Sequence, residues 1–375
     1  MRPVRPARSP RPGSSRERAT PCPRLVALSL GLVAALPACS TAQDRSPEAR
    51  PVPVAEAPKQ PVAEAPKQPP MASFARMLPG SWRVTNPNGT SQTDTWYPGP
   101  GDLSLRVETD GTDGSGSPWR ELVVLFWHPG RAQVRLLGFN PYARSVAEGH
   151  ITFAGDSAEA EIVMHQTPGR RDLVQRWSFA GPDNYREALL ERRGAGGLGL
   201  LAEWDYFRVP TPAAIVRTDP PPTASERLQD LVALVGPTWQ ARGEWAGGGA
   251  FDLQTSFTWI PYADVIHART TARTESGESK HLLDAYLYHH TGADQLRCLA
   301  LSDRGGVYEG DVTVHAGGAL QLDLKGHEDD RATLHAVRLE FEPDGALRQR
   351  VWSLAGDDRT LVLDARHERR ERQAE

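Results

Sequence analysis

The chain has 375 residues, of which 43 are Lys or Arg and 47 are Asp or Glu, and its formal net charge is −4. Residues 1–38 contain seven Arg and one Glu, which leaves the rest of the chain near −10. An acidic chain lacks the basic patch that neutralises phosphates, so we exclude nucleic acid as the main partner. The length suits two ordinary domains.

The N-terminal residues have the pattern of an export signal. Leu25–Ala35 is an apolar run of eleven residues after an Arg-rich stretch. Such a run is too short to span a bilayer and is typical of a signal-peptide core. It leads into Leu36-Pro37-Ala38-Cys39-Ser40, which resembles the lipobox of bacterial lipoproteins. The alternative is an ordinary cleaved signal peptide with an incidental cysteine.

The lipobox resemblance implies that residues 1–38 are removed and that Cys39 is lipidated. The chain would then be anchored to the membrane of the bacterial cell envelope by its N-terminal lipid. In that family a serine after the cysteine, here Ser40, implies sorting to the outer membrane. The folded part would face the periplasm or the exterior.

Residues 39–72 have the composition of an unfolded tether. They are rich in Pro, Ala, Glu, Lys and Gln, and the octamer Pro53–Gln60 is repeated as Pro61–Gln68. Few large apolar residues are present to offset the entropy of ordering, so we expect no folded structure here. Frequent proline makes such a segment an extended spacer, with a reach on the order of 90 Å at about 3.1 Å per residue.

The rest of the chain is an internal duplication. The sequence Leu125–Gly130 is repeated in similar form as Leu287–Gly292, and Glu148–Thr152 is repeated as Glu309–Thr313. Matches in the same order with a slowly changing offset indicate two homologous copies with loop insertions. We place the copies at 73–210 and 224–371.

Each copy is predicted to be a short helix followed by antiparallel strands. Phe74, Met77 and Leu78 have helical spacing, and Thr223–Glu226 is a capping-box pattern. Apolar and polar residues then alternate with a period of two, as at Val337–Phe341, between clusters of Gly, Asn, Asp and Pro. Short alternating strands with tight turns favour a meander closed into a barrel of roughly eight to ten strands.

The start of each copy resembles the lipocalin-type (calycin) signature. Gly80 and Trp82 carry it in copy 1, and Gly236 and Trp239 carry it in copy 2. The resemblance implies a lipocalin-like all-β fold in tandem, with the tryptophan plugging one end of each barrel. The chain also resembles nitrobindin-like barrels, but their haem-ligand context is not recognisable here, so no cofactor is expected.

The candidate ligand-binding residues include one matching histidine from each copy. His128 and His290 occupy matching positions at the end of a strand. If the His290 face pointed into its barrel, copy 2 would have a polar-aromatic pocket and copy 1 an apolar one. The candidates are His128, Trp96, His290, Trp259, Tyr286, Tyr288 and Asp284. The plainer alternative makes the histidines turn residues, and makes the shared tryptophan pairs, Trp96/Trp259 and Trp177/Trp352, core anchors.

No catalytic or metal-ligating residue is predicted. His281, His289 and His290 with Asp284 have no diagnostic metal-ligand spacing. Gly194–Gly199 matches the dinucleotide fingerprint by letters alone, because the βαβ context is missing, and it is interpreted as a turn. Cys298 lies on the side of its strand that carries Leu296 and Ala300, so it is expected to be a buried apolar side chain.

Three functions remain open at this stage. The first is a carrier of a small, partly apolar ligand, which requires a lumen of ~300 Å³ or more. The second is an envelope scaffold with solid barrels, which requires an exposed apolar patch. The third is an enzyme, which requires His290, Asp284 and a tyrosine to converge in a cleft.

Overall fold

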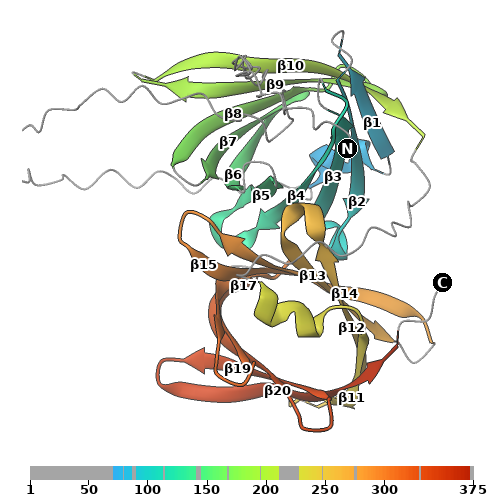
Figure 1. Cartoon of the computed structure of the whole chain (residues 1–375), viewed down its shortest axis with the longest axis vertical. Helices are drawn as coiled ribbons and strands as arrows, with labels where there is room; N and C mark the ends of the chain where they lie inside the picture. The colour runs from blue at the N-terminus through green and yellow to red at the C-terminus, as the bar shows by residue number, and fades with distance from the viewer. Residues whose placement is uncertain are drawn as a thin grey trace, which may run out of the picture.

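The computed structural model describes residues 71–371 except 79, 87–89, 113–114, 141–144, 167–168, 195, 211–227, 247, 274–276 and 329–330. These residues form two closed antiparallel barrels of ten strands each, one above the other in Figure 1. The predicted all-β fold with a tandem repeat is therefore confirmed. The signal segment, Cys39, the tether and the Thr223–Glu226 capping box lie outside the described residues. No helix among those described is long and apolar enough to cross a membrane.

Barrel 1 is built from copy 1, and barrel 2 from copy 2. The strands of barrel 1 are β1 (Gly80–Thr85), β2 (Ser91–Pro98), β3 (Ser104–Thr112), β4 (Pro118–His128), β5 (Gln133–Asn140), β6 (Ser145–Ala154), β7 (Ser157–His165), β8 (Arg170–Ser178), β9 (Asn184–Arg193) and β10 (Gly197–Val209). The strands of barrel 2 are β11 (Thr238–Glu244), β12 (Ala250–Ile260), β13 (Val265–Arg273), β14 (Ser279–His290), β15 (Gln295–Ser302), β16 (Val307–Val314), β17 (Leu320–Glu328), β18 (Arg331–Phe341), β19 (Leu347–Ala355) and β20 (Asp358–Arg370). Short 3-10 helices are η1 (Ala72–Met77), η2 (Pro100–Asp102), η3 (Pro129–Arg131), η4 (Gln229–Leu234) and η5 (Pro261–Ala263).

Each barrel is a meander in which every strand pairs with its neighbours in sequence. Barrel 1 closes through β1 and β10, and barrel 2 closes through β11 and β20. Closure removes the unpaired edges that an open sheet would present. Gly194 and Gly196 lie in the tight turn between β9 and β10, whereas Gly197 and Gly199 of the same motif belong to β10.

A tryptophan fastens a short helix to each barrel in the same way. The indole Nε1 of Trp82 donates a hydrogen bond to the carbonyl oxygen of Met77 (3.4 Å), and that of Trp239 donates to Leu234 (3.0 Å). Both acceptors stand five residues before the tryptophan, at the end of η1 or η4. Both indoles are almost fully buried. The short helix at the start of each copy is thus part of the core, as the sequence predicted.

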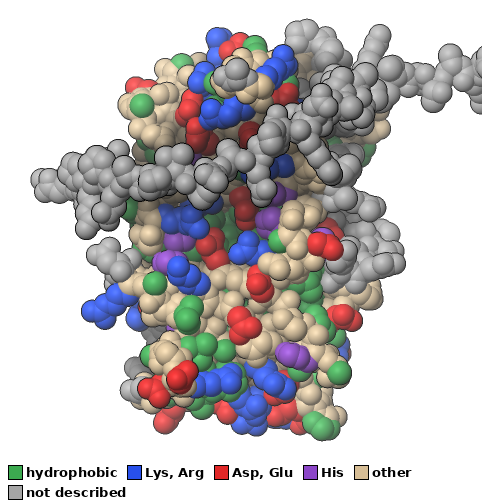
Figure 2. Space-filling model, turned by 90° about the vertical axis from the view of Figure 1, so that its left-hand side faces the viewer, with side chains coloured by type: hydrophobic (Ala, Val, Ile, Leu, Met, Phe, Trp, Pro, Cys, Tyr) green, Lys and Arg blue, Asp and Glu red, His purple; other side chains and the backbone are tan. Residues whose placement is uncertain are grey.

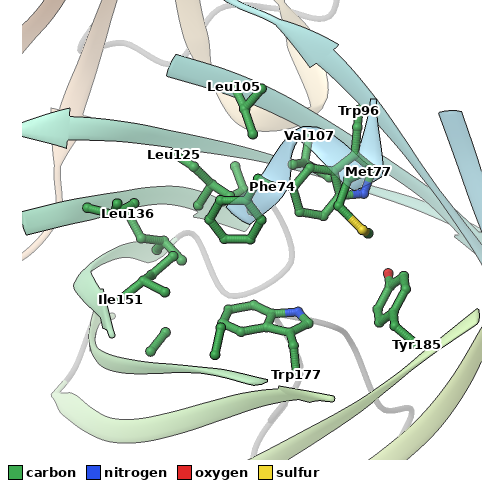
Figure 3. Packing of buried hydrophobic residues seen from close by; sticks show 14 of the residues in the cluster. Phe74, Met77, Trp96, Leu105, Val107, Leu125, Leu136, Ile151, Trp177 and Tyr185 are labelled. Atoms are coloured by element: carbon green, nitrogen blue, oxygen red, sulfur yellow. The ribbon is translucent and has the colours of Figure 1, made fainter. Parts of the chain in front are cut away.

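The lumen of barrel 1 is filled by large side chains. In Figure 3, the ring of Phe74 from η1 lies beside Trp96 and above Trp177. The ring centroids of Phe74 and Trp96 are 5.6 Å apart. The core of barrel 2 contains smaller side chains at inward positions, namely Ala268, Ala285, Cys298 and Ala300. The two lumens are therefore filled to different extents.

One inserted residue accounts for part of this difference. Gln175 and Gln349 are equivalent and both point inward, but Val351 has been inserted between Arg350 and Trp352. A shift of one residue moves a strand side chain to the other face of the sheet. Trp352 therefore leaves the lumen, lies half-buried and stacks under Arg359, with 3.9 Å from guanidinium to ring centroid. The predicted core role is right for Trp177 and wrong for Trp352.

The two barrels meet through a continuous apolar cluster, defined here as the junction. The outward face of β4 supplies Leu122, Val124 and Phe126, and barrel 2 supplies Val265, Tyr286, Tyr288, Leu299, Leu301 and Val307 among others. In Figure 1, β4 and β5 lie next to the top of barrel 2. The centre of β4 is buried on both faces, because Val123 and Leu125 point into barrel 1.

The junction corrects one sequence interpretation. On β14 the residues that line the lumen are Leu283, Ala285 and Leu287. The alternate face, with Tyr286 and Tyr288, packs against barrel 1 instead. The His290 face therefore does not point into barrel 2, and the condition for a polar-aromatic pocket there is not met. Alternation shows that a face is buried, but it does not show against which element.

Candidate functional site

Barrel 2 contains an apolar cavity of about 110 Å³. Side chains from strands all around the barrel line it, including Phe257, Ala268, Leu287, Cys298, Ala300 and Leu324. Cys298 is buried, as expected, and burial raises the pKa of its thiol to about 12. The thiol therefore stays protonated and contributes an apolar wall to the cavity.

The few polar side chains around this cavity are paired with one another. The hydroxyls of Thr255 and Thr270 are 2.9 Å apart, and Nε2 of His367 is 3.0 Å from Oε1 of Gln349. Burial lowers the pKa of His367 to about 4, so its ring is neutral at neutral pH. Among the described lining residues there is no Asp, Glu, Lys or Arg. The cavity suits an uncharged, apolar guest.

The lumens are smaller than the ~300 Å³ that a drug-sized ligand requires. The second cavity, in barrel 1, measures about 30 Å³, which is room for roughly two water molecules. Trp96 lines it, whereas Trp259 packs against the core of barrel 2. The indole Nε1 atoms of both tryptophans make no hydrogen bond within the described residues. Both behave chiefly as core side chains.

Three carboxyl groups are buried inside barrel 1, and none of them was predicted from the sequence. Asp94, Glu121 and Glu187 are each at most 4% exposed. Burial raises the pKa of Asp94 to about 7 and raises the pKa values of Glu121 and Glu187 well above their usual range. Asp94 accepts hydrogen bonds from Thr109 (2.9 Å) and Tyr185 (3.2 Å). The signal was available, because Asp94 and Glu121 each stand two residues before an inward apolar residue.

At the junction, the repeated histidines face glutamates of the opposite barrel. Nε2 of His290 lies 3.5 Å from Oε2 of Glu148, and Nε2 of His128 lies 3.5 Å from Oε2 of Glu309. Burial alone would raise the pKa values of both glutamates, but contact with the histidines holds them below the usual range. Figure 2 shows histidines beside acidic and basic side chains in the band between the barrels.

A second histidine completes each contact. The ring of His165 lies 4.8 Å from that of His290, and the ring of His327 lies 4.7 Å from that of His128. His165 and His327 are equivalent positions in the two copies, as are Glu148 and Glu309. The contacts are therefore reciprocal, as in a two-fold symmetric dimer. We call the set Glu148, His165 and His290 cluster A, and the set Glu309, His327 and His128 cluster B.

The glycines of the repeated text make room for these rings. A Cβ atom on Gly292 would collide with the ring of His165, and one on Gly130 would collide with the ring of His327. The repeated His-x-Gly sequence therefore has a physical reason, which is the docking of one barrel onto the other. His290 also fits the turn-residue alternative, because the backbone N–H of Ala293 donates to its Nδ1 (3.0 Å).

The candidate carboxylate Asp284 does not converge with His290. Asp284 accepts hydrogen bonds from His267 (2.8 Å) and His281 (3.0 Å), and a β-bulge in β14 brings His281 to that side. Burial alone would raise the pKa of Asp284, but these two bonds hold it well below the usual range. His290 lies six residues further along the strand, roughly 20 Å away. The enzyme hypothesis required these two groups to meet, and they do not.

Comparisons with known proteins do not assign the chain to a family. No protein-family model matches the chain, and no curated protein matches it. One solved structure that is similar to this chain is that of a protein of unknown function from Nostoc punctiforme, which belongs to the DUF3598 family. The two share 12% sequence identity with a TM-score of 0.21, over 81% of this chain and 99% of that one.

Asp94 should make stability depend on pH. Between about pH 4 and pH 7 the folded chain keeps the Asp94 proton and the unfolded chain loses it. Its contribution to the free energy of unfolding therefore falls as pH rises through this window, by roughly 1.4 kcal/mol per pH unit. Asp94→Asn should therefore raise the free energy of unfolding above that of the unmodified chain by more near pH 8 than near pH 5, as measured by urea unfolding. Asp357→Asn, at an exposed turn, is the control, and an equal gain at both pH values would contradict the expectation.

Gly292→Ala should weaken the docking of the barrels. The added methyl group collides with His165, and overpacking of this kind typically costs about 1–3 kcal/mol. His165→Ala in the same chain should recover most of the loss, giving a non-additive double-mutant cycle in urea unfolding. Gly197→Ala, which meets no atom, is the matched control. Additive effects of the two substitutions would show that the collision is not the cause.

Proposed function

We propose that the chain is a lipid-anchored protein of the bacterial cell envelope whose second barrel binds one small apolar molecule. The observation that carries the binding proposal is the apolar cavity inside barrel 2. The anchoring part rests on the sequence around Cys39. Barrel 1 serves in this proposal as the support that barrel 2 is docked on.

The size of the cavity sets the size of the guest. An engineered apolar cavity of about 150 Å³ in another protein stays dry and binds benzene, and the cavity here measures about 110 Å³. The guest is therefore a single small ring or a short alkyl chain. It carries no charge, because an ion inside this lumen would lose its hydration without gaining a charged partner.

A scaffold is the second candidate function. The filled lumen of barrel 1 favours it, since that barrel has room for water only. In this alternative both barrels act as solid spacers, and the cavity of barrel 2 is a packing defect. The two candidates differ in whether an apolar molecule stabilises the folded chain.

Benzene is a suitable probe of the cavity. Ligand that binds only the folded state raises the midpoint of thermal unfolding in a concentration-dependent way. We expect this response from the unmodified chain and from Leu334→Ala, which removes an exposed leucine outside barrel 2. Ala300→Leu fills the cavity and should abolish the response while leaving the chain folded. If benzene does not raise the midpoint of thermal unfolding of the unmodified chain, the ligand proposal fails and the scaffold function is favoured.

The anchor is tested separately. Mass spectrometry of the chain extracted from bacterial membranes should show a mature N-terminus at Cys39 that carries acyl chains. Cys39→Ala should move the chain out of the membrane fraction, because lipid chains supply the attachment. A mature chain with an unmodified residue at this position would refute the anchor without affecting the ligand proposal.

A further inference from the structure

We propose that cluster A, made of Glu148, His165 and His290, binds one divalent transition-metal ion such as Zn²⁺ across the junction of the two barrels. One potential ligand atom from each of these residues lies within 4.8 Å of the others. Two of the residues belong to barrel 1, and the third belongs to barrel 2. The site is complete only when the barrels are docked.

The spacing of the ligand atoms is close to what zinc requires. In a tetrahedral site with bonds of about 2.1 Å, ligand atoms lie about 3.4 Å apart. Oε2 of Glu148 is 3.5 Å from Nε2 of His290 and 3.9 Å from Nε2 of His165. Small side-chain rotations close the remaining gap. Two histidines and one glutamate form a known set of zinc ligands that leaves a fourth position for water.

The surroundings hold these ligands in place. Nη1 of Arg297 lies 3.7 Å from Oε1 of Glu148, which leaves Oε2 for the ion. Partners of this kind commonly orient metal-binding carboxylates. When Nε2 of His290 binds the ion, its proton moves to Nδ1, so Nδ1 no longer accepts the hydrogen bond from the N–H of Ala293 and the ring turns away from that N–H. The N–H of Ala293 then keeps its second acceptor, the carbonyl oxygen of His290 at 3.2 Å.

Cluster B provides an internal comparison. It has the same three residue types at equivalent positions, although neighbouring residues differ between the copies, as Tyr288 differs from Phe126. His128 is 1% exposed, and neither of its ring nitrogens makes a hydrogen bond within the described residues. Among those residues, only cluster A brings three ligand atoms within the stated distance. We therefore assign the ion to cluster A.

Metal titration of the untagged full chain tests the proposal. After removal of metals with EDTA, Co²⁺ should bind with one equivalent, develop the visible absorption of a tetrahedral site, and be displaced by Zn²⁺. Zn²⁺ should also raise the midpoint of thermal unfolding. A chain that shows no Co²⁺ absorption and no Zn²⁺ response would overturn the proposal.

Three variants locate the site. His165→Ala and the isosteric Glu148→Gln should each weaken Zn²⁺ binding by at least about tenfold. His327→Ala, the equivalent position in cluster B, should keep the full equivalent of Co²⁺. Circular dichroism verifies that each variant is folded. Unchanged binding in Glu148→Gln, or loss of binding in His327→Ala instead, would overturn the assignment to cluster A.

Discussion

The docking of the two barrels through the outward faces of β4 and β14 is the constraint on which the rest of the structure depends. Phe126, Tyr286 and Tyr288 belong to one buried cluster with residues from both copies. Separating the barrels would expose several aromatic side chains, each burying about 150–250 Å², and so would create a patch larger than a monomer normally tolerates. The copies therefore behave as two subunits joined by a linker.

The sequence predicted the repeat, a barrel of roughly eight to ten strands in each copy, and the helix at the start of each barrel. These follow from local patterns, namely alternation of period two and a tryptophan near a short helix. It could not predict which side of β14 faces the lumen, because β4 and β14 are buried on both faces. Clusters A and B could not be predicted from the sequence either, because each joins residues more than a hundred positions apart. Lone histidines at strand ends carry no sign of a partner in the other copy.

The lumens diverged through small changes at single positions. Trp177 lines the lumen of barrel 1, whereas the inserted Val351 turns Trp352 outward in barrel 2. Replacement of an indole by a smaller inward side chain leaves space that neighbouring side chains fill only in part. Barrel 1 instead keeps three carboxyl groups in a tightly filled interior, where burial disfavours their charged forms. One barrel was thus free to acquire a cavity while the other stayed full.

The contrast between the lumens and the junction explains why both copies have the residues of clusters A and B. Each lumen is enclosed by one copy, so a substitution inside it needs no compensating substitution in the other copy. A junction residue contacts the opposite copy, and reciprocal docking makes each such residue part of two surfaces at once. A change at His290 or Gly292 therefore alters the contact with Glu148 or His165 of the other barrel. The repeated His-x-Gly sequence and the equivalent residues of clusters A and B are therefore found at the junction, and the differences that bear on ligand binding are found in the lumens.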